Sequence, residues 1–283
     1  MNKLLVFQSD FGLADGAAVA MYGVALSVDD SLRIFSLTHD IPPFDTYEAS
    51  YRLFQAVPFW PEGTVFVTVV DPGVGSNRRN VVAKTNRGHY IVTPDNGSLS
   101  HITRELGLES AREIAESVGR RKNSEDSYTF HGRDIFSYTG ALLASGKVPY
   151  EKIGPELDKN SLVMFEGMYP KISEDRINGT IETLDVRFGS LWTNIPKAAF
   201  DEMNIRPGEF LDVTITEGKT TKYHSFIPFM HTFADVEIGE CLLYVNSIGY
   251  ISIAINQGNF AGAYHIGTRE PWHVQIGRIK APK

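Results

Sequence analysis

The sequence predicts an α/β protein, with an N-terminal, mostly parallel sheet flanked by helices and a smaller C-terminal antiparallel β-barrel-like domain. Three observations predict it. Strand-like and helix-like segments alternate in the first half. Residues 64–71 form a continuous apolar run, as in strands buried on both faces of a parallel sheet. From about residue 170 the segments become β-rich, with turn signals between them. We place the boundary near 165–175, giving domains of residues 1–168 and 169–283.

The elements expected in the first half follow in a regular order. A short apolar strand at 3–8 precedes an Ala-rich helix at 13–28, whose apolar positions have helical spacing. Arg87-Gly88 is typical of a hairpin turn between the strands on either side of it. The other expected strands lie at 33–39, 64–71, 80–86, 89–95 and 111–115, and the other helices at 46–57, 98–106 and 133–145.

In the second half only 196–203 is predicted to be helical, because a proline stands at its start. The remaining β-rich segments have the spacing of a small antiparallel barrel or sandwich.

Composition limits the classes of function. The chain has 283 residues, with 27 Lys and Arg against 34 Asp and Glu, for a formal net charge of −7. This acidic balance argues against a sequence-blind binder of nucleic acid, and no stretch approaches the roughly 20 apolar residues that span a bilayer. The single cysteine, Cys241, fits a reducing compartment, and the N-terminus lacks the pattern of a signal peptide. We expect a cytoplasmic protein with small-molecule partners, and neither nucleic acid nor membrane as a partner.

Polar residues follow four of the expected strands in the first half. They are Asp10, His39-Asp40, Asp71 and Asp95-Asn96. The carboxyl ends of strands form the ligand crevice of open α/β sheets, so these residues are candidates for a site. Any one of them could instead start a turn or cap a helix.

The segment 69–79 is the most unusual. An apolar strand runs into Asp71, then a Pro-Gly turn, a second glycine, and Arg78-Arg79. The turn can fold back and place one guanidinium beside Asp71, and we expect the other arginine to be a solvated charge. No Gly-Lys-Ser/Thr follows, so this is not a phosphate loop.

His131 lies near the start of the last helix expected in the first half. The positive end of a helix disfavours the cationic imidazole, and a neutral His131 could orient or deprotonate a water molecule. Gly132 is expected to free the backbone there, with Arg133 and Asp134 in the first helical turn. The carboxylates and histidines suit a metal in residue type, but no metal-ligand spacing occurs at the strand ends, so we expect no metal.

Aromatic and amide side chains gather at 185–195, and Phe44 and Phe233 add further aromatic rings. Such flat faces beside amide groups suit a purine ring, although each residue could equally belong to a barrel core or a turn.

Seven motifs, in this order along the chain, carry a resemblance to a known family: QSDFG, HDIPPFD, VDPGVGSNRR, TPDNGSLS, TFHGRDIF, RFGSLWTNI and NSIGYISIA. The chain resembles the S-adenosylmethionine (SAM) hydroxide adenosyltransferases, the DUF62 family, which are related to adenosyl-fluoride and adenosyl-chloride synthases. The resemblance implies a homotrimer with active sites at subunit interfaces. It also implies metal-independent hydrolysis of SAM, the substrate, to adenosine and L-methionine, with no cofactor.

The resemblance further implies roles for individual residues. Asp71, Arg78 and His131 would hold and activate the water, whereas the halogenases carry other residues at the acid and histidine positions. The substrate would be bound by Asp10, Phe44, Val74, Asp185, Phe188, Ser190, Phe233 and Ser247. Relatives usually carry Asn where this chain has Ser190, and the halogenases carry Arg where it has Ile248, so the adenine and carboxylate contacts are expected to differ.

The expected mechanism is attack of water on the ribose C5′ carbon opposite sulfur. Arg78 would stabilise developing hydroxide, because arginine does not deprotonate in proteins, and either Asp71 or His131 would accept the proton. The alternatives are a halide-using adenosyl-halide synthase, which would form 5′-chloro- or 5′-fluoro-adenosine, and a nucleoside-binding protein without turnover.

Overall fold

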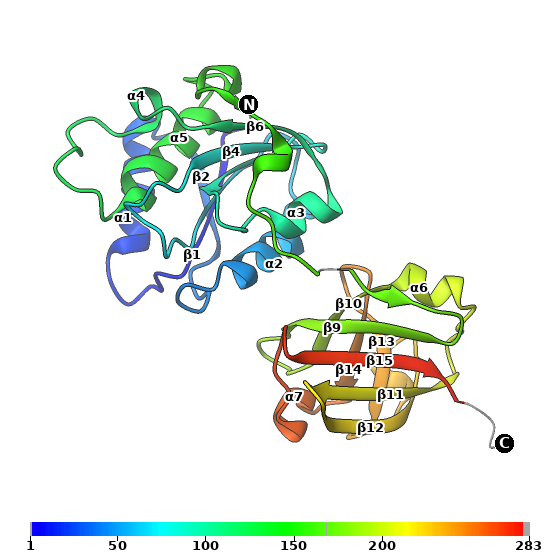
Figure 1. Cartoon of the computed structure of the whole chain (residues 1–283). Coiled ribbons are helices and arrows are strands. Elements are labelled where there is room, and N and C mark those ends of the chain that lie inside the picture. Colours follow the sequence, from blue (N-terminus) through cyan, green and yellow to red (C-terminus); the bar gives the residue numbers. More distant parts are fainter. Residues whose placement is uncertain (1, 168, 280–283) are drawn as a thin grey trace. The chain divides into compact units, whose positions relative to one another are not determined.

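The computed structural model describes residues 2–167 and 169–279, which form two compact units, Met1–Glu166 and Gly167–Lys283. Figure 1 labels their elements. Each unit has its own hydrophobic core, and each is described by itself.

The first unit is built on a seven-stranded mixed sheet of order β2-β1-β3-β5-β4-β6-β7. The strands are β1 (Leu4–Ser9), β2 (Arg33–Thr38), β3 (Val65–Val69), β4 (Asn80–Thr85), β5 (Tyr90–Pro94), β6 (Leu108–Glu113) and β7 (Glu156–Leu157). β2, β1, β3 and β5 run parallel, whereas β4, β6 and β7 join the sheet through antiparallel pairs. The parallel half places the ends of four strands along one edge, which is the edge that the sequence predicts to carry the site.

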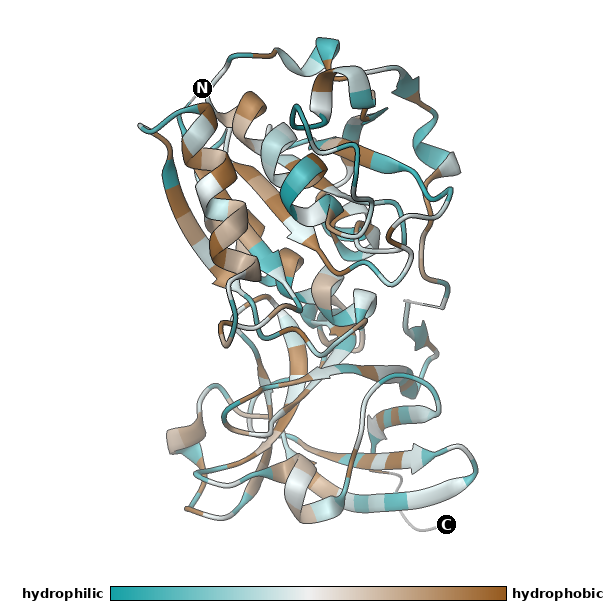
Figure 2. Cartoon of the chain, turned by 90° about the vertical axis from the view of Figure 1, so that its left-hand side faces the viewer, coloured by the Kyte–Doolittle hydropathy of each residue, from teal (hydrophilic) through white to brown (hydrophobic). Residues whose placement is uncertain are grey.

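Helices cover both faces of this sheet. On one face Leu5 and Phe7 of β1 share a core with Met21 and Ala25 of helix α1. On the other face the Nε2 of Gln8 donates to a backbone carbonyl of α2. The helices are α1 (Ala17–Val28), α2 (Thr46–Ala56), α3 (Ser100–Glu105), α4 (Glu116–Gly119) and α5 (Tyr138–Ala144), with short 3-10 turns η1 (Val57–Phe59), η3 (Tyr150–Lys152) and η4 (Lys159–Ser161). In Figure 2 the strands between these helices are largely brown, which marks the apolar core.

The predicted helix at 133–145 is present in two parts. A π-helical segment, η2 (Gly132–Ser137), runs directly into α5, and Arg133 and Asp134 lie in its first turn as expected. π-helical turns are rare and are frequent at functional sites. The hairpin around Arg87-Gly88 is confirmed by the antiparallel pairing of β4 with β5.

The second unit is a nearly closed antiparallel barrel of order β12-β11-β15-β9-β10-β14-β13, with β8 beside β9. Its strands are β8 (Lys171–Ile172), β9 (Arg176–Leu184), β10 (Leu191–Pro196), β11 (Phe210–Glu217), β12 (Thr220–Pro228), β13 (Cys241–Val245), β14 (Tyr250–Ile255) and β15 (Trp272–Arg278). Alternate strand residues such as Leu211, Val213 and Ile215 fill its interior. The helices are α6 (Lys197–Glu202), which the sequence predicts, η5 (Phe233–Asp235) and α7 (Phe260–Tyr264).

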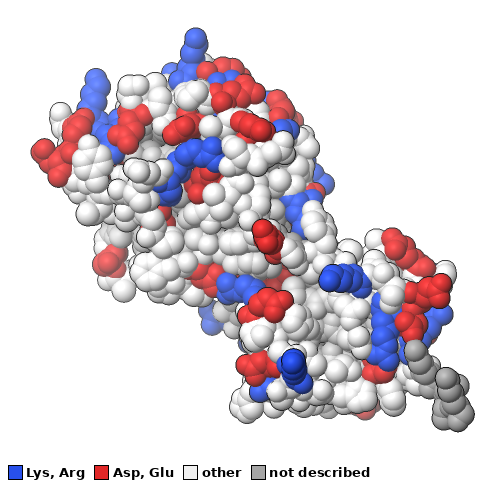
Figure 3. All heavy atoms as spheres, in the orientation of Figure 1, with Lys and Arg blue, Asp and Glu red and all other residues white. Residues whose placement is uncertain are grey.

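Within the described residues, no helix is both long and apolar enough to cross a membrane. Acidic and basic side chains are intermixed over the face shown in Figure 3 in both units. That face therefore carries no broad basic surface of the kind that binds a nucleic-acid backbone.

Candidate active site

The turn after β3 brings Asp71 and Arg78 together. Backbone hydrogen bonds from Val74 to Asp71 and from Ser76 to Gly73 tighten this turn, and Gly75 adopts a φ of +78°, which favours glycine. The chain therefore reverses within seven residues. Nε of Arg78 donates to Oδ1 of Asp71 at 2.7 Å, and Nη2 donates to Oδ2, so the pair is bidentate.

All five N–H donors of the Arg78 guanidinium are engaged. Two go to Asp71, and Nη1 donates to the carbonyl of Arg79 at 3.2 Å and to Oδ1 of Asn80. The fifth, on Nη2, reaches Nδ1 of His131 at 3.3 Å, which is the longest of the five contacts. The guanidinium also lies over the buried ring of Phe136, 5.3 Å from its centre. Arg78 is thus fixed in position, with its weakest contact toward His131.

His131 is held close to this pair by the lack of a side chain at the next residue. A Cβ on Gly132 would lie 3.1–3.3 Å from side-chain atoms of Phe130, Val69 and Phe11. The expectation that Gly132 frees the backbone is not met, because Gly132 does not adopt a positive φ. Glycine is needed there because a side chain would crowd the residues packed against the end of β3.

The environment of His131 favours its neutral form. Burial is the largest cause of a lowered pKa, followed by the positive charges of Arg78 and Arg120, while Asp71 and Glu116 act weakly in the opposite direction. Desolvation and nearby cations both disfavour imidazolium. The field of a helix end, which the sequence suggests, is thus supplemented by burial and two arginines.

Hydrogen bonding assigns the tautomer of His131. Arginine nitrogens only donate, so Nδ1 accepts from Arg78 and Nε2 carries the proton. Nε2 is buried and has no hydrogen-bond partner among the residues that the structure describes. The imidazole therefore presents a basic nitrogen to Arg78 and an unpaired N–H on its other side.

The second arginine is not the solvated charge that the sequence suggests. Arg79 forms an ion pair with Asp95, whose side chain is 3% exposed, and it donates to Ser161. The other Asp95 oxygen accepts from the backbone of Val163 at 2.8 Å. Asp95, at the end of β5, therefore anchors the segment around 161–163 and is not free to bind a ligand.

The loops after β1 and β2 are joined to each other. Oδ2 of Asp10 accepts the backbone N–H of Phe44 at 2.9 Å, where φ is +67°, and the Phe44 ring is exposed. Beneath them the buried His39 lies between Ser9 (Nδ1 to Oγ, 2.6 Å) and Tyr22 (Nε2 to the phenol, 2.5 Å). Asp10 and Phe44 are thus brought together, whereas His39 is a structural link. Asp40 and Val74 are exposed near the same edge.

In the second unit, several predicted binding residues gather around Tyr244. The Ser190 hydroxyl hydrogen-bonds the Tyr244 phenol, and the ring of Phe233 lies against that of Tyr244 with centroids 4.8 Å apart. Asp185 acts electrostatically on the same phenol, whose pKa is raised mainly by burial. Sequence reasoning missed Tyr244, although its place in β13, three residues before Ser247, is a usable signal.

The loop 185–189 presents the remaining predicted side chains. Oδ1 of Asp185 accepts the backbone N–H groups of Arg187 and Phe188 at 3.0 and 3.1 Å, which leaves Oδ2 for other partners. The Phe188 ring is exposed. Ser247 lies exposed in the turn between β13 and β14, a turn tied to α6 through the backbone of Gly249 and Lys197.

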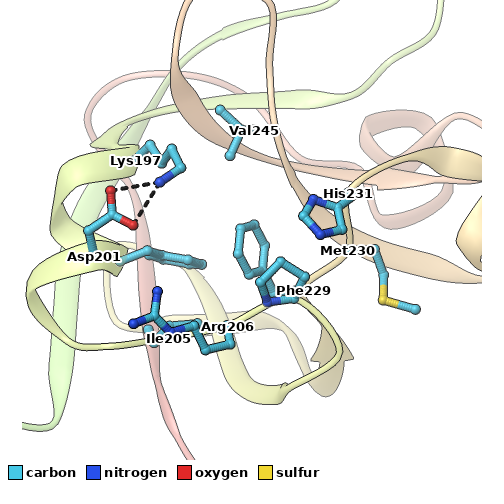
Figure 4. Close-up of a pocket in the computed structure, with 10 residues that line it drawn as sticks. Lys197, Asp201, Ile205, Arg206, Phe229, Met230, His231 and Val245 are labelled. Carbon is cyan, nitrogen blue, oxygen red and sulfur yellow. Dashed lines mark hydrogen bonds and ion pairs between the residues drawn. The ribbon is translucent and has the colours of Figure 1, made fainter.

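A separate cavity of about 420 Å³ lies in the second unit (Figure 4). Phe200, Ile205 and Phe229 are among its apolar lining residues, and none of the predicted site residues lines it. Lys197 at its rim donates to both oxygens of Asp201 at 2.7 Å, so this pair of charges is satisfied within the rim.

Among the described residues, no group of three or more His, Cys, Asp or Glu side chains has the geometry of a metal site. The strand-end carboxylates are instead committed to Arg78, Arg79 and a backbone amide.

Comparison with known proteins follows the two units. Residues 5–154 match the SAM hydroxide adenosyltransferase N-terminal domain, and residues 179–273 match the C-terminal domain of the same family. An "(R)-S-adenosyl-L-methionine hydrolase" of Salinispora tropica is 34% identical over 272 residues, covering 96% of this chain and 97% of that protein. A "Fluorinase" of Nocardia brasiliensis is 28% identical over 300 residues, covering 98% of each. The crystal structure of an uncharacterised conserved protein from Thermotoga maritima superposes with a TM-score of 0.89 at 31% identity, covering 97% of this chain and 100% of that one.

Proposed function

The chain belongs to the SAM hydroxide adenosyltransferase family, and we propose that it hydrolyses S-adenosyl-L-methionine to adenosine and L-methionine. The observation that carries the proposal is the hydrogen-bonded set of Asp71, Arg78 and His131. It combines a fixed cation with a neutral imidazole, which are the groups needed to supply hydroxide near neutral pH.

The geometry also favours one base over the other. Both oxygens of Asp71 already accept hydrogen bonds from Arg78, whereas Nδ1 of His131 faces only a 3.3 Å contact. A water molecule that enters this contact would accept from Nη2 of Arg78 and donate to Nδ1 of His131. We therefore assign the proton to His131, with Asp71 holding the guanidinium in place.

The proposed reaction is a single displacement. The water oxygen forms a bond to the ribose C5′ carbon, the C5′–S bond breaks, and its electron pair goes to sulfur, which leaves as the neutral thioether of L-methionine. The water proton passes to Nδ1 of His131 and then to solvent. Bulk water has a pKa of about 15.7, so a positioned cation and base are needed to supply the nucleophile. A fixed set of groups also sets the in-line approach at about 3–3.5 Å.

Substrate contacts are proposed residue by residue. Asp10 would bind the ribose hydroxyls beside Phe44 and Val74, because its second oxygen is not used by the Phe44 backbone. In the second unit Phe188 and Phe233 would contact the adenine. Ser190 would also contact the adenine, together with Tyr244, because the Ser190 hydroxyl is hydrogen-bonded to the Tyr244 phenol. The methionine amino and carboxylate groups would be bound by Asp185 and Ser247.

Product identification from the purified chain tests the function. The chain is incubated with each sulfur epimer of SAM, because the named hydrolase relatives specify the (R) form. Parallel reactions in fluoride, chloride and halide-free buffer are separated by chromatography. We expect adenosine and L-methionine in every buffer, and the same rate in the presence of a chelator.

The other outcomes are equally distinct. A 5′-halo-adenosine would assign the halide-using reaction, a possibility favoured by the fluorinase relative. Tight adenosine binding without turnover of either epimer would assign a nucleoside-binding protein. Loss of turnover in chelator would assign a metal-dependent hydrolase.

We further propose that the chain acts as a homotrimer in the cytoplasm, with active sites at subunit interfaces, as its family resemblance implies. Light scattering after gel filtration is expected to give three times the chain mass, and a monomer with full turnover would reject the proposal.

A further inference from the structure

Besides Arg78, Arg120 also acts on His131, from another part of the chain. Arg120, directly after α4, has a side chain only 5% exposed, and its Cζ lies 4.7 Å from the centre of the Tyr128 ring. The His131 ring meets the same phenol ring nearly at right angles, with centroids 6.2 Å apart. Tyr128 is thus in contact with both a guanidinium and the imidazole.

The hydrogen bonds of Arg120 do not explain its burial. Nε donates to Oε2 of Glu116 at 2.7 Å, but Nη1 and Nη2 are buried without a hydrogen-bond partner in the described parts of the chain. Glu116 is the first cause of a raised pKa of Arg120 and Asp134 acts in the same direction, so the guanidinium keeps its charge despite burial. Its two buried nitrogens without a partner still call for an explanation. In this place the neighbouring charge-sensitive group is His131.

We propose, on the basis of the proposed function, that Arg120 is a positioning residue that keeps His131 neutral, so that Nδ1 is free to accept a proton from water. The Tyr128 ring holds the guanidinium through a cation–π contact and also contacts the His131 ring, so it links the two groups. Both arginines are paired with a carboxylate, Arg78 with Asp71 and Arg120 with Glu116, and the positive charge of Arg120 adds to the larger effect of Arg78 on His131.

The charges that act most strongly on His131 have opposite signs. Arg78 and Arg120 lower the pKa of the imidazole, as does burial, and Asp71 and Glu116 raise it. When His131 takes a proton, the charge on Arg120 destabilises the imidazolium and favours release of the proton to solvent. Together with burial and Arg78, Arg120 would therefore extend the activity of the base to lower pH.

The test is an NMR titration of the His131 ring, assigned by its loss in His131→Gln. Arg120→Met removes the charge and is expected to raise the His131 pKa by about 0.5–1 unit. Glu116→Gln removes the opposing charge and is expected to lower it. Opposite signs from two neighbouring substitutions distinguish an electrostatic role from a general loosening of the site.

The chain offers a matched control. Arg112 also lies over a tyrosine, 5.4 Å from the ring centre of Tyr150, and also pairs with a glutamate, Glu156. It is not among the main groups that shift the pKa of His131, so Arg112→Met is expected to leave that pKa and the turnover unchanged.

The titration needs no substrate, so its outcome is separate from that of the proposed function. An unchanged His131 pKa in a folded Arg120→Met protein would overturn the role of Arg120. Should that variant not fold, an unchanged pKa in Glu116→Gln would do the same. In active protein the acid limb of kcat/KM is expected to move with the His131 pKa, whereas lack of turnover by the unaltered chain would reject only the hydrolysis.

Discussion

Nη2 of Arg78 lies 3.3 Å from Nδ1 of His131, while the remaining four N–H groups of that guanidinium are taken by Asp71, the carbonyl of Arg79 and Asn80. Arginine has no acceptor atom, so this one contact fixes which imidazole nitrogen is basic. It also joins the turn after β3 to the residue that precedes η2.

Loss of either partner is expected to reduce turnover. His131→Gln and Arg78→Met should each lower kcat for SAM hydrolysis at least tenfold, because one removes the base and the other the cation that holds the nucleophile. Adenosine affinity, measured by calorimetry, should change little. Normal kcat in both variants would contradict the assignment of Asp71, Arg78 and His131 as the water-activating set.

The adjacent arginine gives the contrasting result. Arg79→Met breaks the pair with the buried Asp95 and is expected to lower the free energy of unfolding by about 1–3 kcal/mol. Turnover per folded molecule should stay close to normal, because Arg79 makes no contact with His131. Denaturant titration with an activity assay on the same sample measures both, and a tenfold fall in kcat without a change in stability would contradict this separation.

Gly132→Ala is expected to reduce both kcat and stability. The new Cβ would meet Phe130, Val69 and Phe11 at 3.1–3.3 Å, and the resulting shift would move His131 from Arg78, at a cost of about 1–3 kcal/mol. Gly23→Ala in α1 is the control, since nothing lies within 4 Å of the new Cβ and alanine favours a helix. Gly23→Ala should stabilise the protein slightly and leave kcat unchanged. An equal loss of kcat and stability in both variants would contradict the proposed role of Gly132.

The lowered pKa of His131 predicts the pH dependence of turnover. A base acts only when it is unprotonated, so kcat/KM at pH 6.5, the ordinary pKa of histidine, should exceed half of its plateau value and reach half only at lower pH. A pH profile from 4.5 to 8 measures this limb. Half-maximal activity at or above pH 6.5 would show that the base is another group.

Stability should also depend on pH, through His39 as well as His131. Burial is the first cause of the lowered pKa of both rings. Below pH 6.5 the unfolded chain takes up protons that the folded chain does not, so the free energy of unfolding is expected to decrease from pH 6.5 down to the folded-state pKa values. Well above pH 6.5 these groups contribute no pH dependence, because they are unprotonated in both states. His39→Gln should flatten part of this slope in denaturant titrations, and an unchanged slope would exclude His39 as a contributor.

The sequence by itself determined the two-part fold, because strand and helix periodicities and turn residues act over a few positions and need no knowledge of packing. It also predicted the three residues proposed to activate water, since Asp71, Arg78 and His131 stand in motifs of the family that the chain resembles. Only the tertiary structure decided what these groups can do. The engagement of all five Arg78 donors, the tautomer of His131, the commitment of Arg79 to Asp95, and the placement of Arg120 and Tyr128 beside the imidazole depend on contacts between residues up to 53 positions apart. Hydrogen-bond direction and pKa follow from distance and burial, which local sequence does not encode.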